Sequence, residues 1–191
     1  LPDVTPSLAK KWPNLRLVFR EEKTADVVRD LDEGRLDGGI VALESELGDL
    51  AHETLERDAF MVALPKGHPL AKKARVELAD LDEEPVLLLD EGHCFRDQAL
   101  ALCERAGARE TEFRATSLAT LAQMVSSGAG LTLLLSIAVP VENRRGQLEV
   151  RPFKTAAPSR TIVLVHRKSS PLAPTFRAIA AFLRDKLSAR R

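Results

Sequence analysis

The two cysteines of the chain, Cys94 and Cys103, are the residues best suited to chemistry. Cys94 follows His93 and stands two positions before Arg96, where an apolar run gives way to a helical pattern. The partial positive charge of a helix N-terminus favours a thiolate over a thiol, and a neighbouring cation acts in the same direction. Cys94 is therefore the better nucleophile. Cys103 falls in the last turns of the same helix among apolar residues, where we expect an inert thiol.

The spacing of the two cysteines sets a condition on any bond between them. Nine residues of helix advance by roughly 13 Å and point the two side chains to opposite faces. A disulfide needs Cα atoms closer than about 7 Å. Our hypothesis is that Cys94 is oxidised to a sulfenic acid that Cys103 resolves, so that the helix must come apart. On the residues alone, two unrelated buried cysteines and a zinc site of His93, Cys94 and Cys103 stay open as alternatives.

A strand, a break and a helix position these cysteines. Residues 86–89 form a short apolar run typical of a buried strand, and residues 90–92 interrupt it. The helix is predicted over Phe95 to Ala106, and Gly107 stands where it ends. Its apolar face consists of Phe95, Ala99, Leu102, Cys103 and Ala106.

The rest of the chain alternates predicted helices with predicted strands. Helical segments are predicted at 5–11, 25–33, 78–82, 117–126, 137–142 and 171–187, and strands at 15–20, 36–43, 60–64, 112–114, 131–135, 148–153 and 161–166. This alternation predicts an α/β class with a mostly parallel sheet core. The first strand, helix and second strand predict a parallel pair joined by a right-handed crossover.

Composition argues against several classes of protein. Lys plus Arg and Asp plus Glu number 28 each, so the formal net charge is zero, whereas a module that binds phosphates carries a basic excess. We therefore do not expect this chain alone to bind nucleic acid. The sequence has no signal peptide and no run of about 18 apolar residues. Two cysteines in a chain of this length fit a reducing compartment, so we expect a cytoplasmic protein. We expect no membrane partner, no cofactor and no metal.

Several segments resemble the LysR-type transcriptional regulators. They are GHCFRDQALALC at 92–103, FRATSLATLAQMVSSGAGLTLL at 113–134 and RTIVLVHRKSSPL at 160–172, together with the PKGHPL turn at 65–70. The cysteine segment resembles the peroxide-sensing members of that family. The resemblance implies two Rossmann-like subdomains joined by two crossovers, similar to type II periplasmic binding proteins. We place subdomain I at residues 1–56 plus 162–191, and subdomain II, which carries the cysteines, at 57–161.

The resemblance also implies roles for individual residues. Cys94 is the cysteine that peroxide oxidises, and Cys103 is the one that resolves it. His93, Asp97 and Arg160 match positions that surround the reactive sulfur. Each of the three has a structural alternative: a surface histidine in a turn, a first-turn helix carboxylate that bonds arginine or water, and a solvated arginine at a strand edge.

Three further positions bear on the peroxide site. Thr24 matches a threonine that helps to bind peroxide, although on local grounds it is the N-cap of the helix that follows. A second such threonine of the family lies upstream of Leu1. Leu135 stands where the family more often has proline.

The sequence thus predicts a regulatory domain, not an enzyme, that senses hydrogen peroxide in an oxidative stress response. We expect this domain to form a dimer, with interface candidates at 113–126 and after Leu36, and the full-length protein to form a tetramer. Because the chain begins like the middle of a longer polypeptide, we expect a preceding helix-turn-helix. Promoter DNA and RNA polymerase are expected partners of that full-length protein only. The alternatives are a LysR-type effector domain that binds a small organic anion between its subdomains, and a thiol peroxidase.

Overall fold

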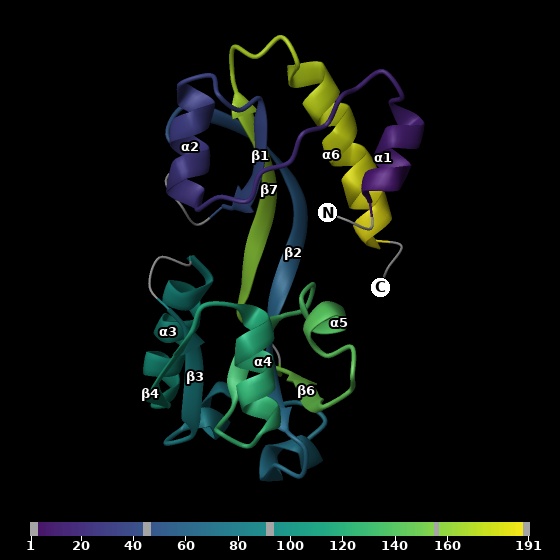
Figure 1. Ribbon diagram of the computed structural model, residues 1–191. Helices are drawn as coiled ribbons and strands as arrows, with labels where there is room; N and C mark the ends of the chain where they lie inside the picture. Colours follow the sequence, from purple (N-terminus) through teal and green to yellow (C-terminus); the bar gives the residue numbers. More distant parts are fainter. Residues whose placement is uncertain (1–3, 44–46, 91–93, 155–156, 189–191) are drawn as a thin grey trace. The chain divides into compact units, whose positions relative to one another are not determined.

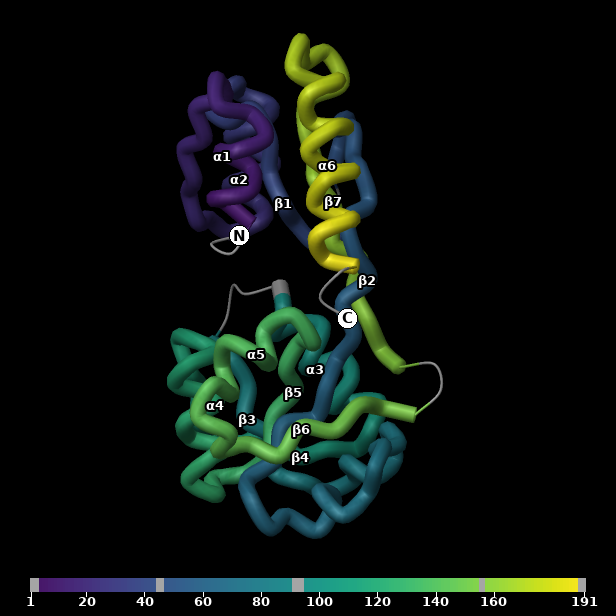
Figure 2. The backbone as a smooth tube through the Cα atoms, turned by 90° about the vertical axis from the view of Figure 1, so that its right-hand side faces the viewer, coloured from purple at the N-terminus to yellow at the C-terminus, as the bar shows by residue number. Residues whose placement is uncertain are grey.

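The computed structural model describes residues 4–43, 47–90, 94–154 and 157–188, and of Cys94 it describes the backbone alone. The chain forms two compact units, Leu1–Arg57 with Thr161–Arg191, and Asp58–Arg160. Strands β2 (Leu50–Pro65) and β7 (Ser159–Arg167) contain residues of both units, as the tube in Figure 2 shows. Each boundary differs by one residue from the expected division into 1–56 with 162–191 and 57–161. That the units act as regulatory subdomains stays a prediction.

The first unit is built around the final helix of the chain. Its elements are α1 (Thr5–Lys11), α2 (Thr24–Asp32), β1 (Gly38–Ala42), the outer part of β7 and α6 (Ala173–Ser188). In α6, Ile179, Ala180 and Leu183 recur at helical spacing and are buried in one apolar cluster with Leu8 of α1, which lies beside α6 in Figure 1. The helix predicted at 171–187 is therefore present, and it buries one apolar face.

The strand predicted at 15–20 is wrong, since the structure has no regular strand there. Leu15 and Leu17 pack against the apolar cluster of α1 and α6, whereas Val18 and Phe19 are 72% and 49% exposed. The alternation therefore reflects two side chains resting on a helical layer, without a hydrogen-bonded ladder. The parallel pair expected between 15–20 and 36–43 is wrong for the same reason. Among the described residues β1 pairs with β7, and the pair is antiparallel.

The second unit surrounds a βαβ segment that carries the cysteines. Its elements after β2 are η1 (Pro69–Lys72), η2 (Leu78–Leu81), β3 (Pro85–Leu89), α3 (Cys94–Ala106), β4 (Arg109–Ala115), α4 (Leu118–Ser126), β5 (Thr132–Leu135), α5 (Val139–Glu142) and β6 (Leu148–Pro152). β3 and β4 are parallel, and α3 supplies the crossover that parallel neighbours require. Leu87 and Leu88 are fully buried, as the uninterrupted apolar run of β3 predicts.

The directions of the strands correct one prediction. β2 pairs antiparallel with both β5 and β6, and β1 pairs antiparallel with β7. Against these antiparallel ladders stand the parallel ladder β3–β4 and the isolated parallel bridges Val76–Phe153 and Val86–Leu131, so a mostly parallel core is wrong. Hydrophobic periodicity identifies a strand but carries no information on the direction of its partner. The alternation of helices and strands nevertheless confirms the α/β class. Within the part of the chain that is described, no helix is long and apolar enough to cross a membrane.

Candidate redox site

Helix α3 begins at Cys94, which confirms the predicted position of this residue at a helix N-terminus. At that position the aligned backbone dipoles favour a thiolate. The side chain of Cys94 and the whole of His93 lie outside the described residues. Their proposed chemistry therefore stays a prediction.

Cys103 lies on the buried face of α3 and is 1% exposed. The face consists of the predicted residues, Phe95, Ala99, Leu102, Cys103 and Ala106, all of them buried. Burial, followed by the negative charges of Glu110 and Glu104, raises the pKa of the Cys103 thiol to about 12. In this conformation Cys103 is a neutral thiol, enclosed by apolar side chains and unable to act as a nucleophile.

The two cysteines cannot bond in this conformation. α3 is continuous from Cys94 to Ala106, so their backbones are separated by roughly 13 Å of helix, beyond the reach of a disulfide. A disulfide between them therefore requires the helix to unwind.

The C-terminal end of α3 is held by a glycine cap. Gly107 has φ +73°, its N–H donates to the carbonyl of Glu104 at 3.2 Å, and the N–H of Ala108 donates to the carbonyl of Cys103 at 3.0 Å. These two bonds form a Schellman motif, which satisfies the last carbonyls of the helix. A Cβ atom at position 107 would collide with Oδ1 of Asp82. Releasing Cys103 from the core therefore means breaking this cap.

The N-terminal end of α3 is held by an aromatic stack. The rings of Phe95 and Phe60 lie nearly parallel at 16°, with their centroids 5.8 Å apart. Phe60 belongs to β2 and stands opposite Leu135 of β5, and both residues are buried in this ladder. The first turn of the cysteine helix is thus docked directly on β2.

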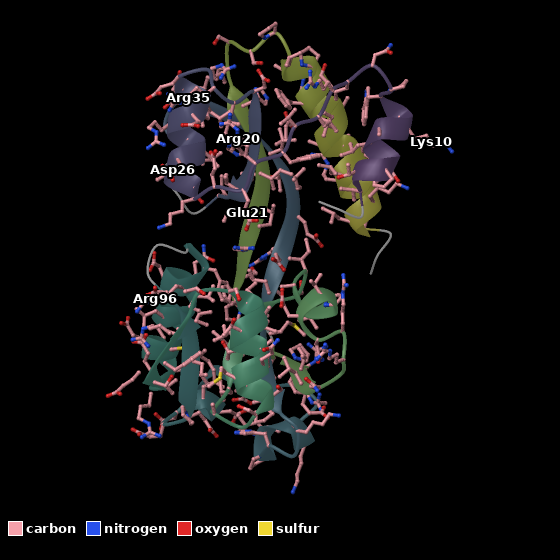
Figure 3. All side chains as sticks on the ribbon, in the orientation of Figure 1. Lys10, Arg20, Glu21, Asp26, Arg35 and Arg96 are labelled. Carbon is pink, nitrogen blue, oxygen red and sulfur yellow. The ribbon has the colours of Figure 1, made fainter. Side chains whose placement is uncertain are left out.

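In the same turn Arg96 is mostly buried and directed toward β4, whereas Asp97 is exposed to solvent. Nη2 of Arg96, a residue labelled in Figure 3, donates to Oε1 of Glu110 at 3.2 Å. The same oxygen forms an ion pair with Nη2 of Arg114 at 3.0 Å. The Asp97 side chain is 75% exposed, and its Oδ1 lies 3.9 Å from Nη1 of Arg96. Asp97 therefore has the arginine neighbour that its structural alternative predicts, and its part in a peroxide site stays a prediction.

Arg160 is mostly buried and faces a buried carboxylate. Its side chain is 17% exposed, and its Nε lies 3.6 Å from Oδ2 of Asp58, which is fully buried. The other oxygen of Asp58 accepts hydrogen bonds from Oγ of Ser136 at 2.8 Å and from the N–H of Ile137 at 3.2 Å. The alternative of a solvated arginine at a strand edge is therefore wrong for Arg160.

Sequence reasoning missed Asp58 and Ser136. A signal for Asp58 was present, because Asp58, Phe60, Val62 and Leu64 alternate along one face of β2 and all four are buried. A charged residue in register with a buried apolar row points inward and needs a partner there. Ser136 directly follows the buried run of β5 and had no comparable signal.

Thr24 is the first residue of α2, and the N-cap of this helix is Lys23, with no side-chain capping bond. The capping role predicted for Thr24 is therefore wrong, because the helix begins one residue earlier than the pattern indicates and Thr24 itself is helical. Thr24 belongs to the first unit, whereas Cys103, Asp97 and Arg160 belong to the second. Its role toward peroxide stays a prediction.

No group of three or more His, Cys, Asp or Glu side chains in the described part of the chain could hold a metal ion. Of the zinc ligands considered, His93 and the Cys94 side chain lie outside that part. Cys103 points into an apolar core with its proton retained, whereas zinc takes the thiolate.

The chain is similar to known proteins over nearly its whole length. Residues 1–188 match the family model described as the LysR substrate binding domain. The hydrogen peroxide-inducible genes activator of Dickeya chrysanthemi is 40% identical over 188 residues, which are 98% of this chain and 62% of that protein. The chain therefore spans about three fifths of the length of this relative.

Two solved structures of OxyR have the same fold. The oxidised form has a TM-score of 0.85 at 39% identity and is matched over 100% of this chain and 90% of that one. The reduced form has a TM-score of 0.87 at 37% identity, over 98% and 88% of the respective chains. Proteins similar to this chain thus exist in two redox forms.

Proposed function

Because the chain belongs to the LysR substrate-binding domain family, we propose that it is the peroxide-sensing regulatory domain of a LysR-type transcriptional regulator. A relative named as a hydrogen peroxide-inducible genes activator, and similar structures described as oxidised and reduced OxyR, support this proposal. The observation that carries it is the placement of both cysteines on one continuous helix, with the second enclosed in the core. Oxidation that joins them would convert a chemical event into a change of fold.

The proposed reaction has two steps. The Cys94 thiolate attacks one oxygen of hydrogen peroxide, the O–O bond breaks, the attacked oxygen keeps its hydrogen as the sulfenic hydroxyl, and the other oxygen departs as hydroxide. Cys94 is thereby oxidised to a sulfenic acid, while the peroxide is reduced. The Cys103 thiolate then attacks the Cys94 sulfur and expels the sulfenic oxygen as hydroxide, which leaves a disulfide. Because Cys103 is buried and protonated, this second step follows only when α3 opens.

The surrounding residues have defined roles in this proposal. The Arg160 guanidinium stabilises the Cys94 thiolate and the departing hydroxide by its charge. His93 and Asp97 shape the environment of the sulfur, and Thr24 binds peroxide through its hydroxyl. The low exposure of Arg160 supports its role, because a cation shielded from water acts more strongly on a nearby anion.

The readout of oxidation belongs to the full-length protein. We expect the domain to dimerise through residues 113–126 and the segment after Leu36, and the full-length regulator to be a cytoplasmic tetramer on promoter DNA that contacts RNA polymerase. Opening of α3 would release the residues around β4 and α4, because α3 is tied to β4 through Arg96 and Glu110. A change at this surface would repack the dimer.

Mass spectrometry after mild peroxide treatment tests the proposal. The wild-type chain should acquire a Cys94–Cys103 linkage, Cys103→Ser should accumulate a sulfenic acid at Cys94, and Cys94→Ser should keep a free thiol at Cys103. Oxidised protein without that linkage would contradict the proposed function.

A kinetic measurement separates the sensor from an enzyme. With dithiothreitol as reductant, a thiol peroxidase would consume peroxide continuously at rates above about 1 s⁻¹ per chain. The proposed sensor should react once and recover slowly, because α3 must refold after each reduction. Sustained fast consumption would identify an enzyme instead.

A further inference from the structure

The carboxylate of Asp58 is held by polar groups on one side only. Oδ1 accepts two hydrogen bonds, from the Ser136 hydroxyl and the Ile137 N–H, whereas Oδ2 and the Arg160 Nε are buried and have no hydrogen-bond partner in the described structure. Asp58 is fully buried, so its charge interacts with Arg160 through a poorly screened environment. The 3.6 Å between Oδ2 and Nε is longer than the 2.7–2.9 Å usual for a charged hydrogen bond.

This geometry keeps Arg160 next to Asp58 by charge, without a hydrogen bond from Nε to the carboxylate. A closed, bidentate pair would neutralise the guanidinium and fix it on the carboxylate. Here Oδ1 of Asp58 is fixed by its own hydrogen bonds, whereas the Nε–H of Arg160 lies near Oδ2 without a hydrogen bond to it. Arg160 is thus kept in a buried position by charge while it retains the capacity to bind a second anion.

The Asp58–Arg160 pair lies beside the docking point of the cysteine helix. Side chains two residues apart on a strand point to the same face, so Asp58 lies on the face of β2 that carries Phe60. Phe60 stacks on Phe95, the residue after Cys94. Phe60 also donates its N–H to the carbonyl of Pro158 at 2.8 Å, which fixes the segment that leads to Arg160 against the same part of β2.

We propose that Asp58 is a positioning residue that holds the Arg160 guanidinium toward the first turn of α3, where it stabilises the hydroxide released when Cys94 reacts with peroxide. This inference rests on the proposed function and deepens it, since it assigns a role to a residue that does not itself touch the reacting atoms. Ser136 donates a hydrogen bond to Asp58 and therefore acts on Arg160 only through Asp58.

The chemistry of two thiol reagents offers a selective readout. Attack on hydrogen peroxide breaks the O–O bond and releases hydroxide, a poor leaving group that a nearby cation stabilises. Attack on iodoacetamide breaks a C–I bond and releases iodide, which needs no such help. Both reactions require the Cys94 thiolate. A residue that positions Arg160 for the leaving group should therefore affect the peroxide rate more than the alkylation rate.

The test measures second-order rate constants of Cys94 with both reagents in a Cys103→Ser background. Asp58→Asn keeps the size of the side chain and removes its charge, and it should slow the peroxide reaction by about tenfold, a fraction of the loss usual for a direct oxyanion donor. Both rates are measured at a pH high enough to ionise Cys94 fully in parent and variant, so that the thiolate fraction is equal, and the alkylation rate should then change by less than about twofold. Asp80→Asn, which removes a carboxylate paired with Lys73 at 2.6 Å in the same unit, is the matched control and should change neither rate.

Two further variants make the result decisive. On an Arg160→Gln background, Asp58→Asn should cause no additional loss in the peroxide rate, because Asp58 acts through Arg160. If Asp58→Asn does not fold, Ser136→Ala removes one anchor without a change of charge and should lower the peroxide rate selectively, by about threefold.

The failure of this inference is distinguishable from failure of the proposed function. If the parent protein reacts quickly with peroxide and Asp58→Asn lowers both rates equally, or neither, the positioning role is refuted while the sensor stands. The positioning role is also refuted if the decreases in peroxide rate caused by Asp58→Asn and by Arg160→Gln are additive in free energy in the double variant. If Cys94 of the parent does not react with peroxide, the proposed function itself is wrong.

Discussion

A thiol that resolves a sulfenic acid must first lose its proton, and in this fold the Cys103 thiol keeps its proton. Burial, together with Glu110 and Glu104, raises its pKa from an ordinary value of 9.0 to about 12. A pKa raised on folding means that the folded state keeps a proton that the unfolded state releases. The stabilisation is therefore complete below pH 9 and is lost as the pH rises toward 12.

This linkage predicts a difference in alkaline stability between two variants. Cys94→Ser, which retains Cys103 as its single thiol, should lose on the order of 1.4 kcal/mol of unfolding free energy per pH unit above pH 9, beyond what a chain without cysteines loses. Cys94→Ser/Cys103→Ala is the matched control, because it lacks the titrating thiol. Urea unfolding followed by circular dichroism at several pH values measures both slopes. If the unfolding free energies of the two variants fall equally with pH, folding does not raise the pKa of the Cys103 thiol.

At the residue scale, the sequence predicted the positions of the two cysteines on their helix, but it did not predict the pair formed by Asp58 and Arg160. The helical spacing of Phe95, Ala99 and Cys103 was sufficient to place Cys103 in the core, since periodicity follows directly from residue order. Asp58 and Arg160 lie 102 positions apart in the sequence, and only the fold brings them together. No local pattern could have paired them, although the register of β2 indicated that Asp58 points inward.

At the element scale too, features with a local sequence pattern were predicted, and features that depend on distant contacts were not. β3, α3 and β4 follow one another along the chain, and each has a clear local signal: an apolar run, a helical face and a terminating glycine. Residues 15–20 alternate as a strand should but have no partner strand in the described structure. Strand formation depends on a neighbouring strand that is often distant in the sequence, and for that reason the directions of pairing were also missed.

The glycine cap of α3 provides a test of the proposed unwinding. Gly107→Ala places a Cβ at φ +73° and against Asp82, so it should destabilise the second unit by about 1–3 kcal/mol. The strain is relieved when the last turn of α3 opens, and we therefore expect faster disulfide formation between Cys94 and Cys103. Thiol titration at fixed times after peroxide addition measures this rate.

Gly128→Ala is the matched control for that experiment. Gly128 has φ +90° and ends α4 with the same two backbone hydrogen bonds as the cap of α3. The N–H of Gly128 donates to the carbonyl of Val125, and the N–H of Ala129 donates to the carbonyl of Met124. A Cβ at Gly128 meets nothing within 4 Å, so this variant carries the backbone strain without the collision and at a helix that has no cysteine. It should lower stability and leave the rate of disulfide formation unchanged. If both variants accelerate the disulfide equally, general destabilisation explains the effect and the end of α3 has no special role.

At the scale of the whole molecule, the residues that hold the cysteine helix and the local cationic group lie in different units. The residues argued to control Cys103, namely Phe60, Arg96, Gly107 and Glu110, all lie in the second unit. The chain as a whole has 28 basic and 28 acidic residues. One local group of cations lies in the first unit, where Lys11 and Lys186 stand over the ring of Phe182 at 4.8 and 5.7 Å.

The balanced charge predicts that the isolated 191-residue chain does not bind duplex DNA. Non-specific binding is driven by the release of counterions from phosphates, which requires a basic excess. Fluorescence anisotropy with a labelled duplex at low salt should therefore show no saturable binding below about 100 μM protein. Any weak binding should arise from the lysine group, and Lys11→Glu/Lys186→Glu should abolish it without a change in the rate of peroxide oxidation. Tight binding that weakens linearly with the logarithm of salt concentration, and that survives these substitutions, would mean that the sensing chain itself contacts DNA.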